Sequence, residues 1–481
     1  MDLDPEEFRR QGRRAVDWVA GYRAGLGALP VRAAVAPGAV RDRLPAMLPE
    51  TPQPLDDLLT VLDDVVVPNS THWQHPGFFG YFPANASLAS LLGDLLSGGL
   101  GAQGMLWSTS PACTEVEQVL LDQLAGALGL PASFTFLGGG GGVIQDSASS
   151  AALVALLAAL HRGSGGRWRE KGVHGRERVY VTGETHSSLA KAVRVAGLGE
   201  RGLRIVDTAP GSLAMSAPAL AAALDADAAA GLCPVLVCPT VGTTGTGTVD
   251  PVRAVARVAH AHGAWVHVDA AWAGVAALCP EFRWVLDGAE LADSFCTDAH
   301  KWLLTAFDAS LLWVRDAAAL PAALSITPEY LRDAASETGA VVDYRDWQVP
   351  LGRRFRALKL WTALHGMGLD GVRAHLRGHV ALAAELAERV RAEPGWVLAA
   401  EPSLALVCLR VDSGDGARDD DVTRAVLEHV NAGGSAYLTH TVVDGRYAIR
   451  VAIGSVATAA EHVDALWSVL RDAHSRLRAS G

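Results

Sequence analysis

The sequence predicts an α/β fold with a mostly parallel central sheet. Short apolar runs rich in β-branched residues recur between about residues 86 and 375, and Ala-rich helical stretches separate them. The runs are almost continuously apolar instead of alternating, which is typical of strands covered by helices on both faces. Ligands of such sheets gather at the carboxyl ends of the strands, so we expect a site there.

The individual elements follow from these patterns. The expected strands are Val179–Thr182, Leu203–Val206, Pro234–Thr240, Trp265–Ala270 and Leu311–Val314. The expected helices between them cover residues 150–161, 187–196, 216–230 and 251–261. Together they form a large domain over residues 86–380.

Residues 1–85 predict a helical arm. From Asp4 to about Gly25, apolar side chains recur at helical spacing, and Leu55–Val67 predicts a second helix that Pro68 stops. This segment has too little apolar surface to form a core of its own. We therefore expect it to pack across a dimer.

Residues 381–481 predict a smaller α+β domain. Its expected elements are a helix over Ala381–Arg391, strands around Leu404–Val411 and Tyr447–Val451, and helices over residues 420–431 and 458–478.

Composition excludes several classes of function. The net charge is −11, and no run of Lys and Arg with interleaved aromatic residues is present, which argues against a nucleic-acid partner. The six cysteines lack zinc-site spacing and fit reduced thiols in the cytoplasm, so no structural metal is expected. The acidic N-terminus is unlike a signal peptide, and no long apolar stretch predicts a membrane span.

Lys301 and Asp269 are the most informative pair of residues. Only four lysines occur in 481 residues, and Lys301 follows Asp269, near the end of an expected strand, by 32 positions. Pyridoxal phosphate (PLP) needs a lysine amine for a Schiff base and a carboxylate that keeps its pyridine nitrogen protonated. Bulky neighbours such as Trp302 predict desolvation, which would lower the pKa of the Lys301 amine. Taken alone, Asp269 is as well explained as the cap of a turn, and Lys301 as a solvated surface charge.

Two further motifs belong to the same region. Gly138–Gly142 precede Ser147 and a helix, a pattern that presents free N–H groups to phosphate and equally fits a capped helix after a flexible loop. A dinucleotide fingerprint is not supported, because the early strand and the later acidic residue are missing. His186 follows the strand Val179–Thr182 and is placed to stack on a pyridine ring, although a lone histidine is more often a surface or core residue.

Seven motifs in chain order resemble the group II pyridoxal-phosphate decarboxylases, most closely the aromatic L-amino acid decarboxylases. They are Thr71-His72-Trp73, Gly80-Tyr81-Phe82-Pro83, Ser110-Pro111-Ala112-Cys113-Thr114-Glu115, Gly141-Gly142-Val143-Ile144-Gln145, His267-Val268-Asp269-Ala270-Ala271, His300-Lys301-Trp302 and Pro350-Leu351-Gly352-Arg353-Arg354-Phe355. The resemblance covers nearly the whole chain. It implies an aspartate-aminotransferase-like fold (PLP fold type I) and a homodimer with active sites at the interface. The implied activity is PLP-dependent decarboxylation of an aromatic L-amino acid (tryptophan, 5-hydroxytryptophan, DOPA, tyrosine or phenylalanine) to the arylalkylamine.

The resemblance also implies roles for single residues. Around the cofactor it places Lys301 as the Schiff-base lysine, Asp269 as the partner of the pyridine nitrogen, His186 as the stacking ring, Ala148 and Ser149 at the phosphate, and Thr244, Asp298 and His300 as further contacts. Around the substrate it places Trp73, Pro83, Ala84, His300 and Gly352, with Met105 and Trp107 reaching in from the other subunit.

Tyr330 matches the catalytic tyrosine of a mobile lid in these relatives. A phenol on a closed lid would protonate the substrate α-carbon after CO2 leaves. Relatives with Phe at this position, or without the stacking histidine, form aldehydes, so Tyr330 and His186 together favour simple decarboxylation.

Four positions distinguish this chain from the animal enzymes. Asp298 replaces an Asn that contacts the phosphate, and its charge would repel that group unless it turned away or were matched by donors. Ala84 stands where Thr is usual, and Gln103 and Met105 replace an aliphatic and an aromatic residue of the pocket wall. Gly352 resembles the small residue that goes with indolic substrates in plant relatives, where Ser goes with phenolic ones.

Other functions remain open at this point. The nearest is an aldehyde synthase on the same scaffold. A catalytically inactive homologue would act only as a dimeric interaction protein, and an NAD oxidoreductase would need the fingerprint that is missing.

Overall fold

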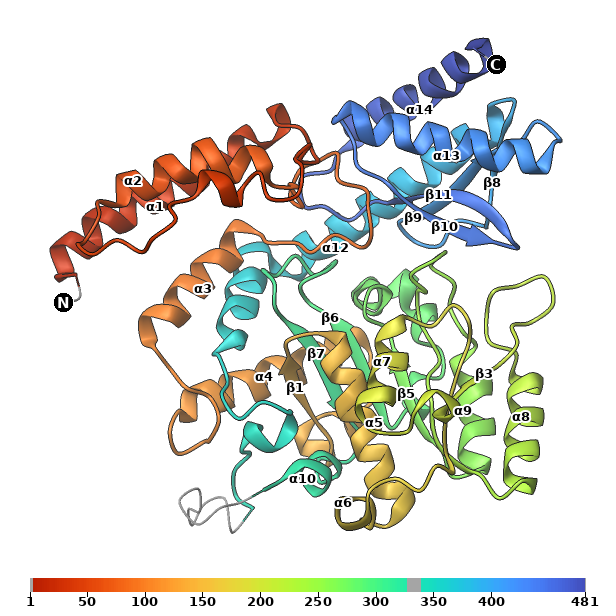
Figure 1. Cartoon of the computed structure of the whole chain (residues 1–481). Coiled ribbons are helices and arrows are strands. Elements are labelled where there is room, and N and C mark those ends of the chain that lie inside the picture. The colour runs from red at the N-terminus through yellow and green to blue at the C-terminus, as the bar shows by residue number, and fades with distance from the viewer. Residues whose placement is uncertain (1–2, 327–338, 481) are drawn as a thin grey trace. The chain divides into compact units, whose positions relative to one another are not determined.

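The structure is a computed structural model that describes residues 3–326 and 339–480. The chain forms two compact units. The larger comprises Ala84–Ala383 and Glu401–Leu406, and the smaller comprises Met1–Pro83, Ala384–Ala400 and Val407–Gly481. Figure 1 traces the chain through both.

The larger unit is built on a seven-stranded sheet with the order β1-β7-β6-β5-β4-β2-β3. The strands are β1 (Gly141–Gln145), β2 (Glu177–Val181), β3 (Leu203–Ile205), β4 (Cys233–Val237), β5 (Trp265–Asp269), β6 (Ser294–Asp298) and β7 (Ser310–Val314). The strands β3, β2, β4, β5 and β6 pair in parallel, and β7 runs antiparallel to both β6 and β1. The prediction of a mostly parallel sheet is confirmed, and β1 and β6 are additional to the expected strands.

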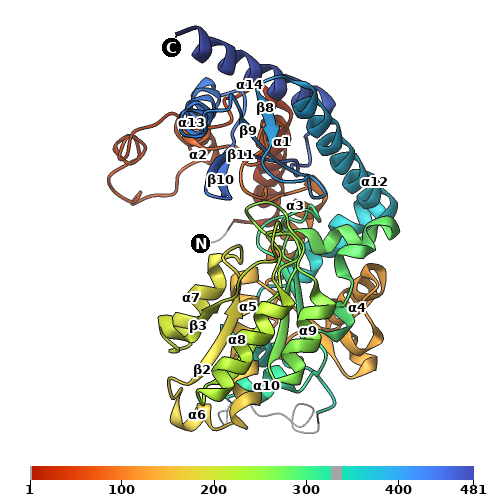
Figure 2. The ribbon, with the colours of Figure 1, turned by 90° about the vertical axis from the view of Figure 1, so that its right-hand side faces the viewer.

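Helices lie on both faces of this sheet (Figures 1 and 2). The helices of the larger unit are α3 (Leu88–Leu100), α4 (Pro111–Leu128), α5 (Ala148–Ser164), α6 (Trp168–Lys171), α7 (Ser187–Val195), α8 (Ala217–Ala229), α9 (Val252–Ala261), α10 (Ala319–Leu324) and most of α12 (Arg356–Ala392), and not all of them contact the sheet. Gly368 interrupts α12 with non-helical torsion angles (φ 63°, ψ 163°), and residues 384–392 belong to the smaller unit.

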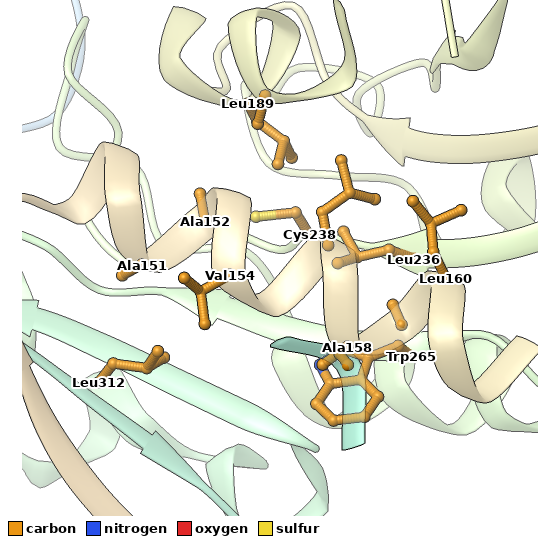
Figure 3. Packing of buried hydrophobic residues seen from close by; sticks show 14 of the residues in the cluster. Ala151, Ala152, Val154, Ala158, Leu160, Leu189, Leu236, Cys238, Trp265 and Leu312 are labelled. Carbon is orange, nitrogen blue, oxygen red and sulfur yellow. The ribbon is translucent and has the colours of Figure 1, made fainter. Parts of the chain in front are cut away.

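The core of the larger unit lies around α5. Small side chains such as Ala151, Ala152 and Ala158 let this helix approach the sheet closely, and they pack with residues of β4, β5 and α7 (Figure 3). Leu236 and Trp265 from the sheet are almost completely buried there. This packing fixes the position of the N-terminus of α5 against the strands.

The last two residues of the glycine run belong to the sheet. Gly141 and Gly142 begin the buried strand β1 and pair with β7. A Cβ atom at Gly141 would come within 2.6 Å of Phe136, and one at Gly142 within 2.9 Å of Leu121 and Trp313. Glycine is therefore required here by close packing of side chains. β1 also precedes the helix that begins at Ala148, so the prediction that no strand comes before this helix was wrong.

The smaller unit combines helices with a four-stranded sheet of order β10-β11-β9-β8. Its elements are α1 (Pro5–Gly25), α2 (Leu55–Val61), β8 (Trp396–Leu398), β9 (Leu406–Val411), α13 (Gly416–Gly433), β10 (Thr439–Val443), β11 (Arg446–Ala452) and α14 (Ala460–Ser480). Asp4 caps α1 by accepting from the N–H groups of Glu6 and Glu7.

The end of the second helix differs from the prediction. α2 ends at Val61, and the chain continues through a wider π turn over Leu62–Val66 and a 3₁₀ turn over Val67–Asn69. Pro68 lies inside the 3₁₀ turn, so the proline does not end the helical segment at Val67 as predicted. Proline is tolerated there because the first positions of a helical turn need no internal N–H donor.

Candidate functional site

Two carboxylates and a lysine lie at the carboxyl ends of neighbouring strands. β5 ends at Asp269, β6 ends at Asp298, and Lys301 follows in the turn after β6. Asp269 is opposite Cys296 in the parallel pairing of β5 with β6, so both strands end at the same edge of the sheet. In an open α/β sheet this edge is where ligands bind.

Lys301 forms an ion pair with Asp298. Its Nζ lies 2.8 Å from Asp298 Oδ2, and the lysine side chain is 24% exposed whereas that of Asp298 is 2% exposed. Burial alone would lower the pKa of Lys301, but the charge and hydrogen bond of Asp298, with a further contribution from Asp269, raise it. The prediction of a lowered pKa is therefore wrong for this structure. The apolar neighbours are present, and the carboxylate three residues earlier outweighs them.

Asp298 is incompletely satisfied. Burial would raise the pKa of its carboxyl, but Lys301, His300 and Ser310 outweigh burial and lower it. Among the described residues, its Oδ1 is buried without a hydrogen-bond partner, and so is the hydroxyl of Ser310, which lies opposite on β7. Ser310 thus acts on the carboxylate by proximity, with a geometry that falls short of a hydrogen bond.

The strand neighbours of Asp269 are neutral. It is 8% exposed, and it accepts from the N–H of Ala271 at 3.0 Å and from the thiol of Cys296 at 3.9 Å. Behind Cys296, His267 is completely buried, with Nδ1 2.8 Å from Ser294 Oγ. Burial lowers the pKa of His267 to about 4 and raises the pKa of the Cys296 thiol. Neither group carries charge at pH 7, so a cation in front of Asp269 would be its natural partner.

His186 follows β2 and caps α7. Its Nδ1 accepts from the N–H of Ser188 at 3.2 Å, while the side chain remains exposed. Loss of hydration lowers the pKa of His186, Asp269 opposes this change and Lys301 reinforces it. Because β2 is parallel to β4 and β4 is parallel to β5, His186 lies at the same edge of the sheet as Asp269. A neutral imidazole held at one nitrogen offers a face for stacking.

The N-terminus of α5 supplies free donors. Ser147 caps the helix by accepting from the N–H of Ser150. In the described part of the chain, the N–H groups of Ala148 and Ser149 have no hydrogen-bond partner, and Ser149 is exposed. Free N–H groups and the positive end of the helix dipole favour an anion such as phosphate.

Thr244 is exposed in the loop that follows β4. The base of this loop is fixed by Asp250, whose two oxygens accept from the N–H groups of Thr240 and Met215, each at 2.7 Å. Burial raises the pKa of Asp250 to about 6. The carboxylate therefore has a structural role in holding the loop.

His300 and Ala84 lie on two segments that are joined by hydrogen bonds. The N–H of Asn85 donates to His300 O, and Asn85 Nδ2 donates to Lys301 O, both at 2.7 Å. His300 is buried, and its Nδ1 accepts from Ala309 N at 3.0 Å. Burial lowers the pKa of His300, so the ring beside Asp298 is neutral.

Met105, Trp107 and Gly352 form a second group in the same unit. Gln103 Oε1 accepts from the N–H groups of Met105 and of Arg353, the residue after Gly352, each at 3.0 Å. Trp107 donates from its ring nitrogen to Glu115 at 2.8 Å. The structure thus gathers three predicted substrate residues around one short turn.

The remaining predicted residues lie elsewhere. Trp73 and Pro83 belong to the smaller unit, where Trp73 is exposed and stacks on Phe78 with ring centroids 4.6 Å apart, and Pro83 is buried. Tyr330 lies outside the described residues.

Two residues that support Lys301 were not predicted in these roles. Asp298, which the resemblance places among the cofactor contacts, is paired with the lysine, and Asn85 holds the lysine carbonyl. The spacing of Asp298 and Lys301, three residues apart, was the only sequence signal for the first. Nothing local identifies Asn85, because its partners are more than 200 residues away.

Lys359 is the other buried lysine. Its side chain is completely buried, with Nζ 3.5 Å from Asp94 and 3.7 Å from Asp308, and burial lowers its pKa. A bulky group cannot reach an amine that is enclosed in this way. Of the two buried amines, only that of Lys301 is accessible to a cofactor.

These groups fit pyridoxal phosphate. One edge of the sheet carries four groups: the accessible amine of Lys301, the buried carboxylate of Asp269, the exposed neutral ring of His186 and the N-terminus of α5. They match the aldehyde, pyridine nitrogen, ring face and phosphate of that cofactor in chemistry.

Comparisons with known proteins agree with this chemistry. The model of the pyridoxal-dependent decarboxylase conserved domain matches residues 37–412. Tyrosine decarboxylase 4 of Petroselinum crispum is 44% identical over 479 residues, which cover 98% of this chain and 94% of the relative. Phenylacetaldehyde synthase of Arabidopsis thaliana is 42% identical over 484 residues, covering 99% and 97%. A solved structure of Oryza sativa TDC with PLP and tryptamine is 40% identical, with a TM-score of 0.96 and 99% of each chain covered.

Within the described residues, no helix combines the length and apolarity needed to cross a bilayer.

Proposed function

Because the chain belongs to the pyridoxal-dependent decarboxylase family, we propose that it removes CO2 from an aromatic L-amino acid and releases the corresponding arylalkylamine. The observation that carries this proposal is the grouping of Lys301, Asp269 and His186 at one edge of the sheet. The relatives support the aromatic class of substrate, since they include a tyrosine decarboxylase and a TDC solved with tryptamine.

Pyridoxal phosphate would be held by the strand-end groups. Lys301 would bind its aldehyde carbon, Asp269 its ring nitrogen and His186 its ring face, while Ala148, Ser149 and Thr244 would bind the phosphate. When bound, the protonated ring accepts the electron pair that the departing carboxylate leaves behind. Asp269 keeps that ring charged, because its neighbours His267 and Cys296 are neutral and give it no other cation.

The other residues of the chain would orient the substrate and handle protons. His186 limits the tilt of the ring stacked on it, because its own ring is fixed through Ser188. Tyr330 would deliver a proton to the α-carbon of the substrate, and Lys301 would displace the product amine. Ala84, His300, Met105, Trp107 and Gly352 of the larger unit would contact the aromatic substrate, as the resemblance implies.

Aldehyde synthesis is the second candidate, because a phenylacetaldehyde synthase is 42% identical to this chain. Both reactions begin with loss of CO2, and they differ in whether the α-carbon is protonated or oxidised. Tyr330 and His186 favour protonation, because members of the resembled family that lack either residue produce aldehydes instead of amines. Peroxide release at less than a few per cent of amine release would be the expected balance.

We also propose that the chain acts as a homodimer. α3 buries only the small residues Ser90, Gly93 and Ser97 and exposes five leucines, at positions 88, 92, 95, 96 and 100. α1 buries no residue of its 21. A second copy would cover these faces and would bring Met105 and Trp107 to its active site. Light scattering of the purified chain distinguishes a dimer from a monomer.

The cytoplasm is the proposed location. All six cysteines are free and five are buried, as expected for thiols that stay reduced. Labelling of the thiols in freshly lysed cells, without added reductant, should find all of them reactive after unfolding.

A substrate panel tests the proposed activity. The purified chain with pyridoxal phosphate is given tryptophan, 5-hydroxytryptophan, DOPA, tyrosine, phenylalanine, histidine and glutamate, and amine, CO2 and peroxide are measured. We expect equal amounts of amine and CO2 from at least one aromatic substrate and none from glutamate. Aldehyde and peroxide as the main products would assign the chain to the second candidate.

A further inference from the structure

Asp298 has a place in the site that the proposed activity does not require. Resting on the proposed function, we propose that Asp298 controls when Lys301 accepts the cofactor. Its carboxylate holds the amine as an ammonium ion, and attachment of pyridoxal phosphate requires that ion to give up a proton first.

The pair is fixed before any ligand arrives. Asp298 ends β6 between β5 and β7, and its side chain is 2% exposed. Lys301 is held through its backbone, where its N–H donates to Asp298 O at 3.2 Å and its carbonyl accepts from Asn85 at 2.7 Å. The 2.8 Å contact between Nζ and Oδ2 therefore joins two groups with little freedom to separate.

The other groups around Lys301 reinforce the ion pair. The pKa of Lys301 is raised against the effect of burial, first by Asp298 and then by Asp269. His186 and His300 are the basic groups that face the same space, and burial lowers the pKa of each. Neither imidazole therefore competes with the ammonium ion of Lys301 for Asp298 at pH 7.

Attachment of the cofactor needs the neutral amine. The ammonium ion of Lys301 releases one proton to solvent, the freed lone pair attacks the aldehyde carbon, and the aldehyde oxygen leaves as water. Asp298 is a poor acceptor for that proton, because its own pKa is lowered. Loading should consequently depend on the small fraction of neutral amine, which increases with pH. Asparagine at this position would have nearly the same shape without the charge.

The experiment measures loading and not turnover. The full-length chain is freed of cofactor, pyridoxal phosphate is added at several pH values, and the absorbance of the bound cofactor is followed in time. For the wild type we expect the rate to increase roughly tenfold per pH unit between pH 7.5 and 9, without a plateau. For Asp298→Asn we expect loading at pH 7.5 to be about tenfold faster or more, with a plateau at lower pH.

Asp370→Asn is the matched control. Asp370 belongs to the same unit, its side chain is completely exposed, and its substitution changes the net charge of the chain by the same amount. We expect the wild-type profile from this variant. Equal pH profiles for wild type and Asp298→Asn would overturn the inference.

The outcomes separate this inference from the proposed function. A chain that binds no pyridoxal phosphate at any pH would contradict the function itself. If the wild type binds pyridoxal phosphate but its loading rate reaches a plateau below pH 9, the proposed function stands and the inference is contradicted. This measurement uses only the wild type, so it does not depend on whether a variant folds.

Discussion

Two buried ion pairs in the larger unit differ in how completely they are satisfied. Glu117 and Arg353 are both 0% exposed and form two parallel hydrogen bonds, of 2.6 Å and 2.5 Å. Ile144 donates to Glu117 at 2.7 Å and accepts from Arg353 at 2.8 Å, and the guanidinium lies 4.4 Å from the centre of the Tyr344 ring. Within residues 3–326 and 339–480, the pair of Lys301 with Asp298 leaves one buried oxygen without a hydrogen-bond partner and an amine that is partly accessible.

The difference shows which pair holds the fold and which is prepared for a ligand. A buried ion pair stabilises a structure only when its remaining donors and acceptors are matched, as they are around Glu117 and Arg353. That pair ties α4 and β1 to the segment before α12. The incompletely matched pair marks the place where another molecule supplies the missing interactions.

Lys301→Ala should have the largest effect. The variant loses the amine that binds the cofactor, so turnover should decrease by a factor on the order of 10³ or more, and the absorbance of bound cofactor should disappear. Lys191→Ala, in which an exposed lysine of α7 is removed, is the control and should keep both. Normal turnover in Lys301→Ala would contradict the assignment.

Arg353→Met should mainly reduce stability. Removal of the arginine leaves Glu117 buried without its partner, which costs about 3–5 kcal/mol. We expect the thermal midpoint to decrease by on the order of 5–10 °C, measured by circular dichroism. The double variant Glu117→Met/Arg353→Met should recover part of the loss. A midpoint unchanged in the single variant would show that the pair does not support the fold.

His267→Asn should reduce the dependence of stability on pH. The pKa of His267 is lowered to about 4 in the folded chain, so its contribution is present above pH 6.5 and is lost as pH decreases toward 4, by about 3 kcal/mol. His375 has the same direction and value, and Asp250, whose pKa is raised to about 6, acts oppositely. Both remain in the variant, so thermal midpoints compared between pH 7 and 4 isolate His267. Parallel curves for variant and wild type would contradict this account.

Tyr330→Phe should change the products. Loss of a proton donor decreases amine formation by about 10²-fold, and the unprotonated carbon is then open to oxygen. We expect aldehyde and peroxide to increase relative to amine, measured by chromatography and a peroxide assay. The product ratio of the wild type would speak against a role for this residue.

Gly352→Ser should have the smallest effect. A Cβ atom at position 352 would lie 3.6 Å from Gln103 Nε2, so the side chain fits without strain. We expect kcat/KM for tryptophan relative to tyrosine to decrease by roughly tenfold, because the added hydroxyl narrows the pocket and favours a phenol. Gly378→Ser, at a helix position with open space, is the control. An unchanged ratio of the two kcat/KM values would show that Gly352 does not contact the substrate.

Sequence patterns predicted the parallel strands well and the glycine strand poorly. β4 and β5 are mostly apolar, and so is the antiparallel β7, so the local sequence alone indicates these strands. β1 begins with Gly141 and Gly142, which are required by side chains of Phe136, Leu121 and Trp313 that approach from elsewhere in the chain. Such a requirement is tertiary and has no local signal.

The site shows the same limit. Asp269 and His186 were found because they lie near or just after the ends of expected strands, and parallel strands end at one edge. Lys301 was found through the rarity of lysine in this chain and through its pairing with Asp269, because the strand before it was not expected. The pKa of Lys301 was predicted in the wrong direction, because the apolar neighbours are evident in the sequence and the ion pair with Asp298 depends on the turn between them.

Chemical mapping of the cofactor tests the central claim most directly. The chain loaded with pyridoxal phosphate is treated with borohydride, which makes the bond to the amine permanent, and the digested peptides are analysed by mass spectrometry. The account predicts that the cofactor is attached to Lys301. Attachment to Lys171, Lys191 or Lys359, or to none of the four lysines, would contradict it.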